Sequence, residues 1–178
     1  MENFRFQMDL HKWDVNLTKY EDAKKAYEDY GERIKNLDQS IIDINFLHAD
    51  TENKYAFHKT NGGKHSVIKD PNGIVYIETS GDEFSIHEIT HIRQSLMMGG
   101  LRFKGGQSGK LEYAGYRFEE NAAADYEIEA YQKQHSFNGS FRGARFLNEI
   151  NLWSVGNMRD EKYKLIYPFI YDLARKKK

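Results

Sequence analysis

The pentapeptide His87-Glu88-Ile89-Thr90-His91 constrains this 178-residue chain more than any other stretch. Residues four apart lie on the same face of an α-helix, so both imidazoles can reach a single metal ion. Glu88 lies about 100° around the helix from His87, which suits it to contact a metal-bound water as a base rather than to act as a ligand. The motif predicts a helix that carries half of a metal site. The alternative is two histidines with ordinary packing or surface roles.

The flanking sequence predicts where this helix begins and ends. Ser80-Gly81-Asp82-Glu83 has the S-x-x-E pattern of a capping box, and Gly99-Gly100 is typical of a helix C-terminus. Between these ends, four aliphatic residues recur at helical spacing and predict a buried stripe, with the histidines in a second inward-facing row. The four are Ile86, Ile89, Ile92 and Leu96.

The rest of the site must come from elsewhere in the chain. The sequence has no cysteine, so a metal ion would be bound by histidine, aspartate or glutamate alone. Catalytic zinc usually has three protein ligands, which leaves one to be found. The candidates are His11, His48, His58, His65, His135, Glu119, Glu120, Asp125, Glu127 and Glu129.

Glu127 ranks first among these candidates. Alanines stand three and four residues before it and three residues after it, so its side of a helix would let another helix approach closely. Glu120 shares that face and is the reserve candidate. Glu129 ranks third because its helical neighbours are mostly polar and predict a face in contact with water. The alternative for Glu127 is a plain surface glutamate.

The remaining pattern predicts one α+β domain spanning residues 1–178, because the length fits a single core. The turn residues Asp70-Pro71-Asn72-Gly73 predict a hairpin immediately before the motif helix. The expected elements are an irregular arm over 1–16, a helix over 18–37, strands over 41–47, 54–58, 65–69 and 73–78, a mobile glycine-rich loop over 99–110, and helices over 116–134, 146–155 and 161–175.

Charge and hydropathy exclude several partner classes. The net charge of −1 argues against a nucleic-acid surface, and no run approaches the 18 apolar residues of a membrane-spanning helix. The N-terminal residues lack the basic and apolar regions of a signal peptide, so a free-standing chain is expected in the cytoplasm. A domain excised from a larger protein would look the same. The oligomeric state stays open.

The motif followed on a later helix by Glu127-x-x-Ala130 resembles the gluzincin metallopeptidases. The resemblance implies a zincin-like fold, with a small twisted antiparallel or mixed sheet, an active-site helix, a glutamate-bearing helix and further C-terminal helices. It implies Zn²⁺ bound by His87, His91 and Glu127, and peptide hydrolysis with Glu88 as general base.

The chain departs from the gluzincin pattern in one place. Many such enzymes have Asp four residues after the ligand glutamate, where this chain has Tyr131. Asp125 or Glu120 is the expected substitute that would orient a ligand histidine. Two further runs, from Glu127 to Phe137 and from Leu165 to Pro168, are similar to metallopeptidase-like domains at the C-termini of RHS-repeat proteins.

The sequence leaves parts of the mechanism and the biological role open. Tyr113, Tyr116, Tyr131 and His135 are all candidates to donate a hydrogen bond to the transition state. Strand 73–78 could pair with an extended substrate, and loop 99–110 could cover the site. The competing functions are a catalytically silent zincin-like module that binds a protein partner, and an effector or toxin domain of a larger secreted protein.

Overall fold

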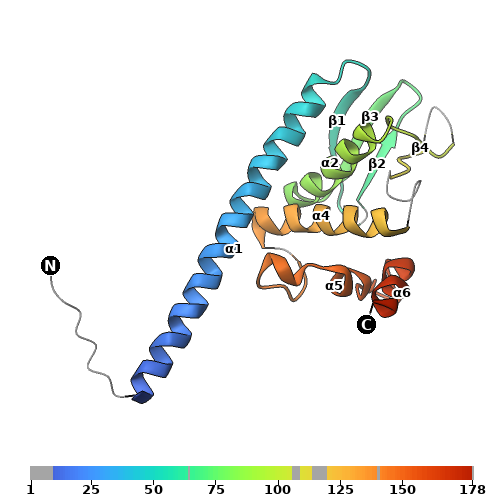
Figure 1. Ribbon diagram of the computed structural model, residues 1–178. Coiled ribbons are helices and arrows are strands. Elements are labelled where there is room, and N and C mark those ends of the chain that lie inside the picture. Colours follow the sequence, from blue (N-terminus) through green and yellow to red (C-terminus); the bar gives the residue numbers. More distant parts are fainter. Residues whose placement is uncertain (1–9, 64, 106–108, 114–119, 140, 178) are drawn as a thin grey trace.

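The structure is a computed structural model that describes residues 10–63, 65–105, 109–113, 120–139 and 141–177. The described chain is α+β, with a four-stranded mixed sheet and several helices (Figure 1). Its elements are α1 (Leu10–Ala49), β1 (Lys54–Lys59), β2 (Ser66–Lys69), β3 (Ile74–Thr79), α2 (Asp82–Met97), β4 (Gly109–Lys110), α4 (Glu120–Asn138), the 3-10 turn η1 (Leu147–Glu149), α5 (Leu152–Gly156) and α6 (Pro168–Lys176).

Helix α1 replaces three of the predicted elements. The predicted helix over 18–37 is confirmed but is longer, and the predictions of an irregular arm over 10–16 and a strand over 41–47 are wrong. Residues 1–9 of the arm lie outside the described part. The β-branched pair Ile41-Ile42 suggested a strand, yet Ser40, Asp43 and Leu47 are the buried residues, and their spacing of three and four is helical. Packing of this face overrides local strand propensity.

The sheet has the strand order β1-β3-β2-β4. Strand β1 is parallel to β3, whereas β2 is antiparallel to both β3 and β4. The predicted hairpin of β2 and β3 is confirmed: the Asp70 carboxylate accepts the N–H groups of Asn72 and Ile74 at 2.9 and 2.8 Å, and Gly73 has φ +85°. Val75 and Ile77 are buried on the face opposite Tyr76, as their alternation predicted.

The predictions for the strand over 73–78 and the loop over 99–110 need correction. Strand β3 lies between β1 and β2, so its backbone is already paired on both edges and cannot add a substrate strand. The segment predicted as a mobile loop over 99–110 includes β4, which pairs with β2 as the fourth strand. Residues 106–108 of that segment lie outside the described part.

Helix α2 packs against both the sheet and α4 (Figure 1). Its buried isoleucines Ile89 and Ile92 meet Val67, Val75 and Ile77 of the sheet in one hydrophobic cluster, which confirms the predicted stripe. The helix ends before Gly99 and Gly100, both at positive φ, as expected. Its N-cap, however, is Gly81 and makes no side-chain hydrogen bond, so the predicted Ser80 capping box is wrong.

The C-terminal segment forms a second hydrophobic cluster with α4. Ile150, Val155 and Ile170 are buried against Ala124 of α4. The long helices predicted over 146–155 and 161–175 are shorter than expected: the first is divided into η1 and α5, and the second begins only at Pro168. Proline at the first helical position explains this, because it lacks the N–H that an interior residue would donate.

Candidate metal centre

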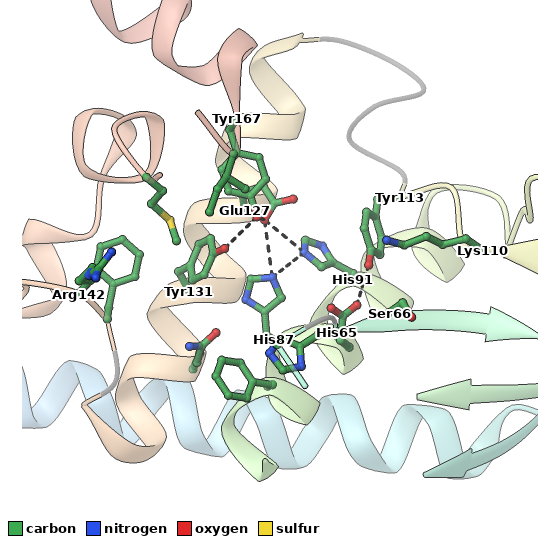
Figure 2. Close-up of a pocket in the computed structure, with 17 residues that line it drawn as sticks. His65, Ser66, His87, His91, Lys110, Tyr113, Glu127, Tyr131, Arg142 and Tyr167 are labelled. Atoms are coloured by element: carbon green, nitrogen blue, oxygen red, sulfur yellow. Dashed lines mark hydrogen bonds and ion pairs between the residues drawn. The ribbon is translucent and has the colours of Figure 1, made fainter. Parts of the chain in front are cut away.

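Three buried side chains from α2 and α4 converge on one point (Figure 2). The Nε2 atoms of His87 and His91 lie 3.1 Å apart, and Oε2 of Glu127 lies 3.6 Å from the first and 3.5 Å from the second. Among the described residues, this is the group of histidine and acidic side chains whose spacing suits a metal ion. The structure therefore brings together the residues that the sequence ranked first.

The spacing of the three donor atoms allows one small metal ion to reach all of them, because the atoms are 3.1, 3.5 and 3.6 Å apart. A point about 2.0 Å from all three atoms exists, which is a zinc-to-ligand distance. Two imidazoles and one carboxylate also suit zinc far better than calcium, which prefers oxygen ligands.

Small residues on α4 allow this convergence. Ala123, Ala124 and Ala130 are buried, and they leave room for α2 to pack closely against the face that carries Glu127. The two histidines are one turn apart on α2, so both rings point toward that face. The predicted helix-to-helix approach at Glu127 is confirmed.

Burial and charge act against each other within the group of three. Burial alone would lower the pKa of His91, but the Glu127 carboxylate beside it raises that pKa to about 9. Burial alone would raise the pKa of Glu127, whereas His91 and His87 hold it well below its usual range. Without a metal, a proton on His91 supplies part of the positive charge that a bound cation would place beside Glu127. The site is built to stabilise positive charge between these side chains.

A hydrogen-bonded chain orients His91 from behind. Its Nδ1 atom donates to Oε1 of Gln94 at 2.8 Å, and the Gln94 amide in turn donates to Glu129 Oε2 at 2.8 Å. Glu129 is also paired with Arg93 and Lys133. This chain directs Nε2 of His91 toward the other two donors, because the tautomer is set by the bond at the opposite nitrogen.

Sequence reasoning missed this orienting group. Asp125, expected in that role, is exposed, and the side chain of Glu120 lies outside the described part. Glu129, expected to face water, instead contacts α2 through Gln94 and Arg93. A signal was present in the sequence: Gln94 lies three residues after His91 and therefore on the same side of the helix.

Two tyrosines hold Glu127 and His87 from the other side. The Tyr167 hydroxyl donates to Oε2 of Glu127 at 3.0 Å, and the Tyr131 hydroxyl lies 2.8 Å from that of Tyr167. The Tyr131 ring packs edge-on against His87, with the ring centroids 4.5 Å apart. Burial raises the pKa of Tyr131, and the Glu127 charge adds to the effect, so its phenol stays protonated. The residue that departs from the gluzincin pattern thus contacts the site directly.

Glu88 lines the same cavity as the three donors. Oε2 of its carboxylate accepts a hydrogen bond of 2.7 Å from the Tyr113 hydroxyl, and the Tyr113 ring packs against His91. The cavity has a volume of about 800 Å³, within the range of ligand pockets. Lys110 and Arg142 line it on opposite sides of the three donors.

The other candidate ligands that the structure describes do not join the group of three donor atoms. His65 lines the cavity but stacks on Phe84 at a centroid distance of 3.9 Å, and burial lowers its pKa. His135 is buried, and its backbone carbonyl accepts from Arg33 of α1. His58 is exposed beside Glu78, and His48 is exposed near the end of α1. Glu119, Tyr116 and the side chains of His11 and Glu120 lie outside the described part.

Comparisons with known proteins add no assignment, since no family model, curated protein or solved structure matches the chain. In the described part of the chain, no helix is both long enough and apolar enough to cross a membrane.

Proposed function

We propose that this chain is a zinc-dependent peptidase of the gluzincin type, with zinc bound by His87, His91 and Glu127. The observation that carries the proposal is the convergence of three buried donor atoms, 3.1 to 3.6 Å apart, on a cavity that Glu88 also lines. A packed core has no need of a carboxylate beside such a group of donors. The zincin-like fold remains part of the same proposal, supported by the order of sheet, histidine helix and glutamate helix.

Each side chain has a distinct role in this proposal. Zinc would supply a Lewis acid that lowers the pKa of a bound water and polarises the scissile carbonyl. Glu88 accepts the proton of the attacking water and returns it to the leaving amine. Tyr113 orients Glu88 through its 2.7 Å hydrogen bond. Gln94 and Tyr167 hold the ligands His91 and Glu127 in place.

Two of the four predicted transition-state donors remain candidates. Tyr113 and Tyr131 both line the cavity, and a phenol there could donate to the developing oxyanion. His135 is not among the residues lining the cavity, and Tyr116 lies outside the described part. Both hydroxyls already have a partner, Glu88 for Tyr113 and Tyr167 for Tyr131, so either one would exchange that partner in order to donate to the oxyanion.

Metal content and one substitution test the proposal. Protein purified without chelator should contain close to one zinc per chain and should hydrolyse an unstructured protein such as casein. Glu88→Gln should keep the zinc and lose hydrolysis, because it removes the base but no ligand. Glu83→Gln, on the first turn of the same helix, is the matched control and should keep both.

The possible outcomes distinguish the competing roles. Folded protein that binds no zinc, or an active Glu88→Gln variant, would refute the proposed chemistry. Zinc binding without hydrolysis of any peptide would favour a silent binding module. Toxicity on expression that disappears with Glu88→Gln would indicate an effector that acts through the same chemistry. Iron in place of zinc would point to oxygenase chemistry on two histidines and one carboxylate.

A further inference from the structure

Helix α1 carries an apolar stripe that the rest of the described chain leaves exposed. Its N-terminal half extends beyond the sheet and the other helices (Figure 1). The stripe consists of Tyr20, Ala23, Tyr27, Tyr30, Ile34, Leu37 and Ile41. The three tyrosines are 68%, 80% and 63% exposed. Contiguous apolar surface of this kind is uncommon on monomeric proteins and marks interaction sites.

The spacing of the stripe is that of a coiled coil. Tyr20, Tyr27, Ile34 and Ile41 are seven residues apart, and the remaining three members follow the first three of these by three residues each. This alternation of three and four gives the a and d positions of three consecutive heptads. An apolar seven-residue repeat keeps one seam of a helix facing a partner helix as the two supercoil.

The stripe is separate from the side of α1 that packs on its own chain. That side consists of the buried Ser40 and of four residues that meet α2, α4 and η1 through side-chain contacts, namely Asp29, Arg33, Asn36 and Asp43. On a helical wheel its centre lies about 130° from the centre of the stripe. A partner helix can therefore lie along the stripe while α1 keeps all its contacts with the body.

We propose that the stripe binds the same stripe of a second copy of this chain, as a parallel two-stranded coiled coil. In a parallel coiled coil, Ile34 at an a position and Leu37 at the next d position are the combination that favours two strands over three or four. Two-fold symmetry places the two bodies on opposite sides of the pair, so they do not compete for space. The proposal does not depend on the metal centre.

The area of the stripe is sufficient for a dimer. At the exposures given above, the three tyrosines contribute roughly 400 Å² per chain, and the two isoleucines add to it. Two copies would bury roughly 1,000 to 1,200 Å² in total, which reaches the lower range of specific interfaces. Charge agrees at the end nearer the body, where Arg33 at a g position faces Asp38 at the partner's e position: one guanidinium N–H of Arg33 donates to the His135 carbonyl of its own chain, and the others can reach that carboxylate. At the end farther from the body, Lys19 of one chain faces Lys24 of the other, and salt and solvent screen the repulsion between them.

Adjacent isoleucines provide a matched test. Ile41 lies on the stripe and Ile42 lies off it, yet they are 58% and 57% exposed. We expect full-length protein to be a dimer that dissociates on dilution in sedimentation velocity runs. The pair Ile34→Lys and Ile41→Lys should give a monomer, whereas Ile42→Lys and Phe46→Lys, of similar exposure, should leave the dimer intact.

Cross-linking tests the orientation without depending on the lysine variants. The chain has no cysteine, so Tyr20→Cys introduces a single thiol. In a parallel pair the two copies of this residue face each other at a distance that a disulfide can span, whereas in an antiparallel pair they lie far apart. Tyr20→Cys should form a disulfide-linked dimer on oxidation, and Lys25→Cys, on the other side of the helix, should not.

Each result supports or overturns the proposal. Loss of the dimer only in the stripe variant, together with the Tyr20→Cys cross-link, supports it. A monomer at all concentrations up to about 100 μM overturns it and leaves the stripe to another partner. A dimer that survives Ile34→Lys and Ile41→Lys overturns the assigned surface. A dimer without the Tyr20→Cys cross-link overturns the parallel arrangement.

Discussion

If zinc binds as proposed, replacing Gln94 with leucine should weaken its binding without changing any of the three proposed ligands. Gln94 accepts from Nδ1 of His91 at 2.8 Å, and its amide donates to Glu129 and to the Tyr126 carbonyl. Leucine has a similar volume but can make none of these bonds. Glu129 keeps its two cationic partners, so the main loss falls on His91, whose buried Nδ1–H is left without an acceptor. Loss of such an orienting partner costs roughly 10- to 100-fold in metal affinity, about 1.4 to 2.7 kcal/mol.

Competition with a chromophoric zinc chelator measures this change directly. Gln132→Leu is the matched control, because Gln132 on α4 donates to the Leu147 and Ile150 carbonyls and does not contact the metal centre. Both variants should lose about 1 to 2 kcal/mol of unfolding free energy. Only Gln94→Leu should lose zinc affinity. If its dissociation constant stays within twofold of the unmodified protein, the Gln94 chain does not position His91 and the reasoning fails.

Three other perturbations act on the same region. In metal-free protein the His91 pKa is raised from 6.5 to about 9, so its ion pair stabilises the fold fully below pH 6.5 and loses this effect as pH rises through 9. Zinc bound as proposed must displace that proton, so calorimetry at pH 7 should detect the release of about one proton per zinc ion. The affinity for zinc should rise about tenfold per pH unit up to pH 8.5. Binding without proton release would contradict this. Lys133→Met leaves Asp43 with one cationic partner, and urea unfolding should show a loss of about 3 kcal/mol; a loss below 1 would contradict it. Tyr113→Phe removes the bond to Glu88 and should lower kcat/KM about tenfold at unchanged zinc content, whereas unchanged kcat/KM would exclude a positioning role.

The arrangement of the candidate site was largely predictable from the sequence because its information is local. His87 and His91 are one turn apart, and the alanines around Glu127 identify the helix face that can approach them. The hydrogen bond from Tyr167 to Glu127 was not predictable in the same way. Tyr167 comes from the start of α6, forty residues after Glu127, and no periodicity relates the two positions. Only the assembled fold reveals such a contact.

The fold was predicted where turn chemistry or helical period was unambiguous. The hairpin at Asp70 and the stripe of α2 are examples. The prediction failed for residues 41–47, where apolar residues occur on every side of the segment. Ile41 and Ile42 are exposed, Leu47 is buried, and the residue buried most completely is Asp43, which a hydropathy pattern places in solvent. The burial of an acidic residue can be predicted from a sequence only when its cationic partner is known.

That partner explains how α1 is oriented on the body. Because apolar residues surround α1 near its C-terminal end, hydrophobic burial alone does not specify which side packs inward. Asp43 specifies that side, because its carboxylate pairs with both Lys133 and Arg93. Nζ of Lys133 lies 2.5 Å from Oδ2 of Asp43. Buried ion pairs add little net stability over apolar packing, and fixing one arrangement among several is their best-supported use. Arg93 and Lys133 also form ion pairs with Glu129. Glu129 accepts a hydrogen bond from Gln94, and Gln94 accepts one from His91. We infer that the rotation of α1 and the position of His91 are set together. Lys133→Met tests this, because zinc affinity should fall along with stability, and unchanged affinity would show that the ion pairs serve the fold alone.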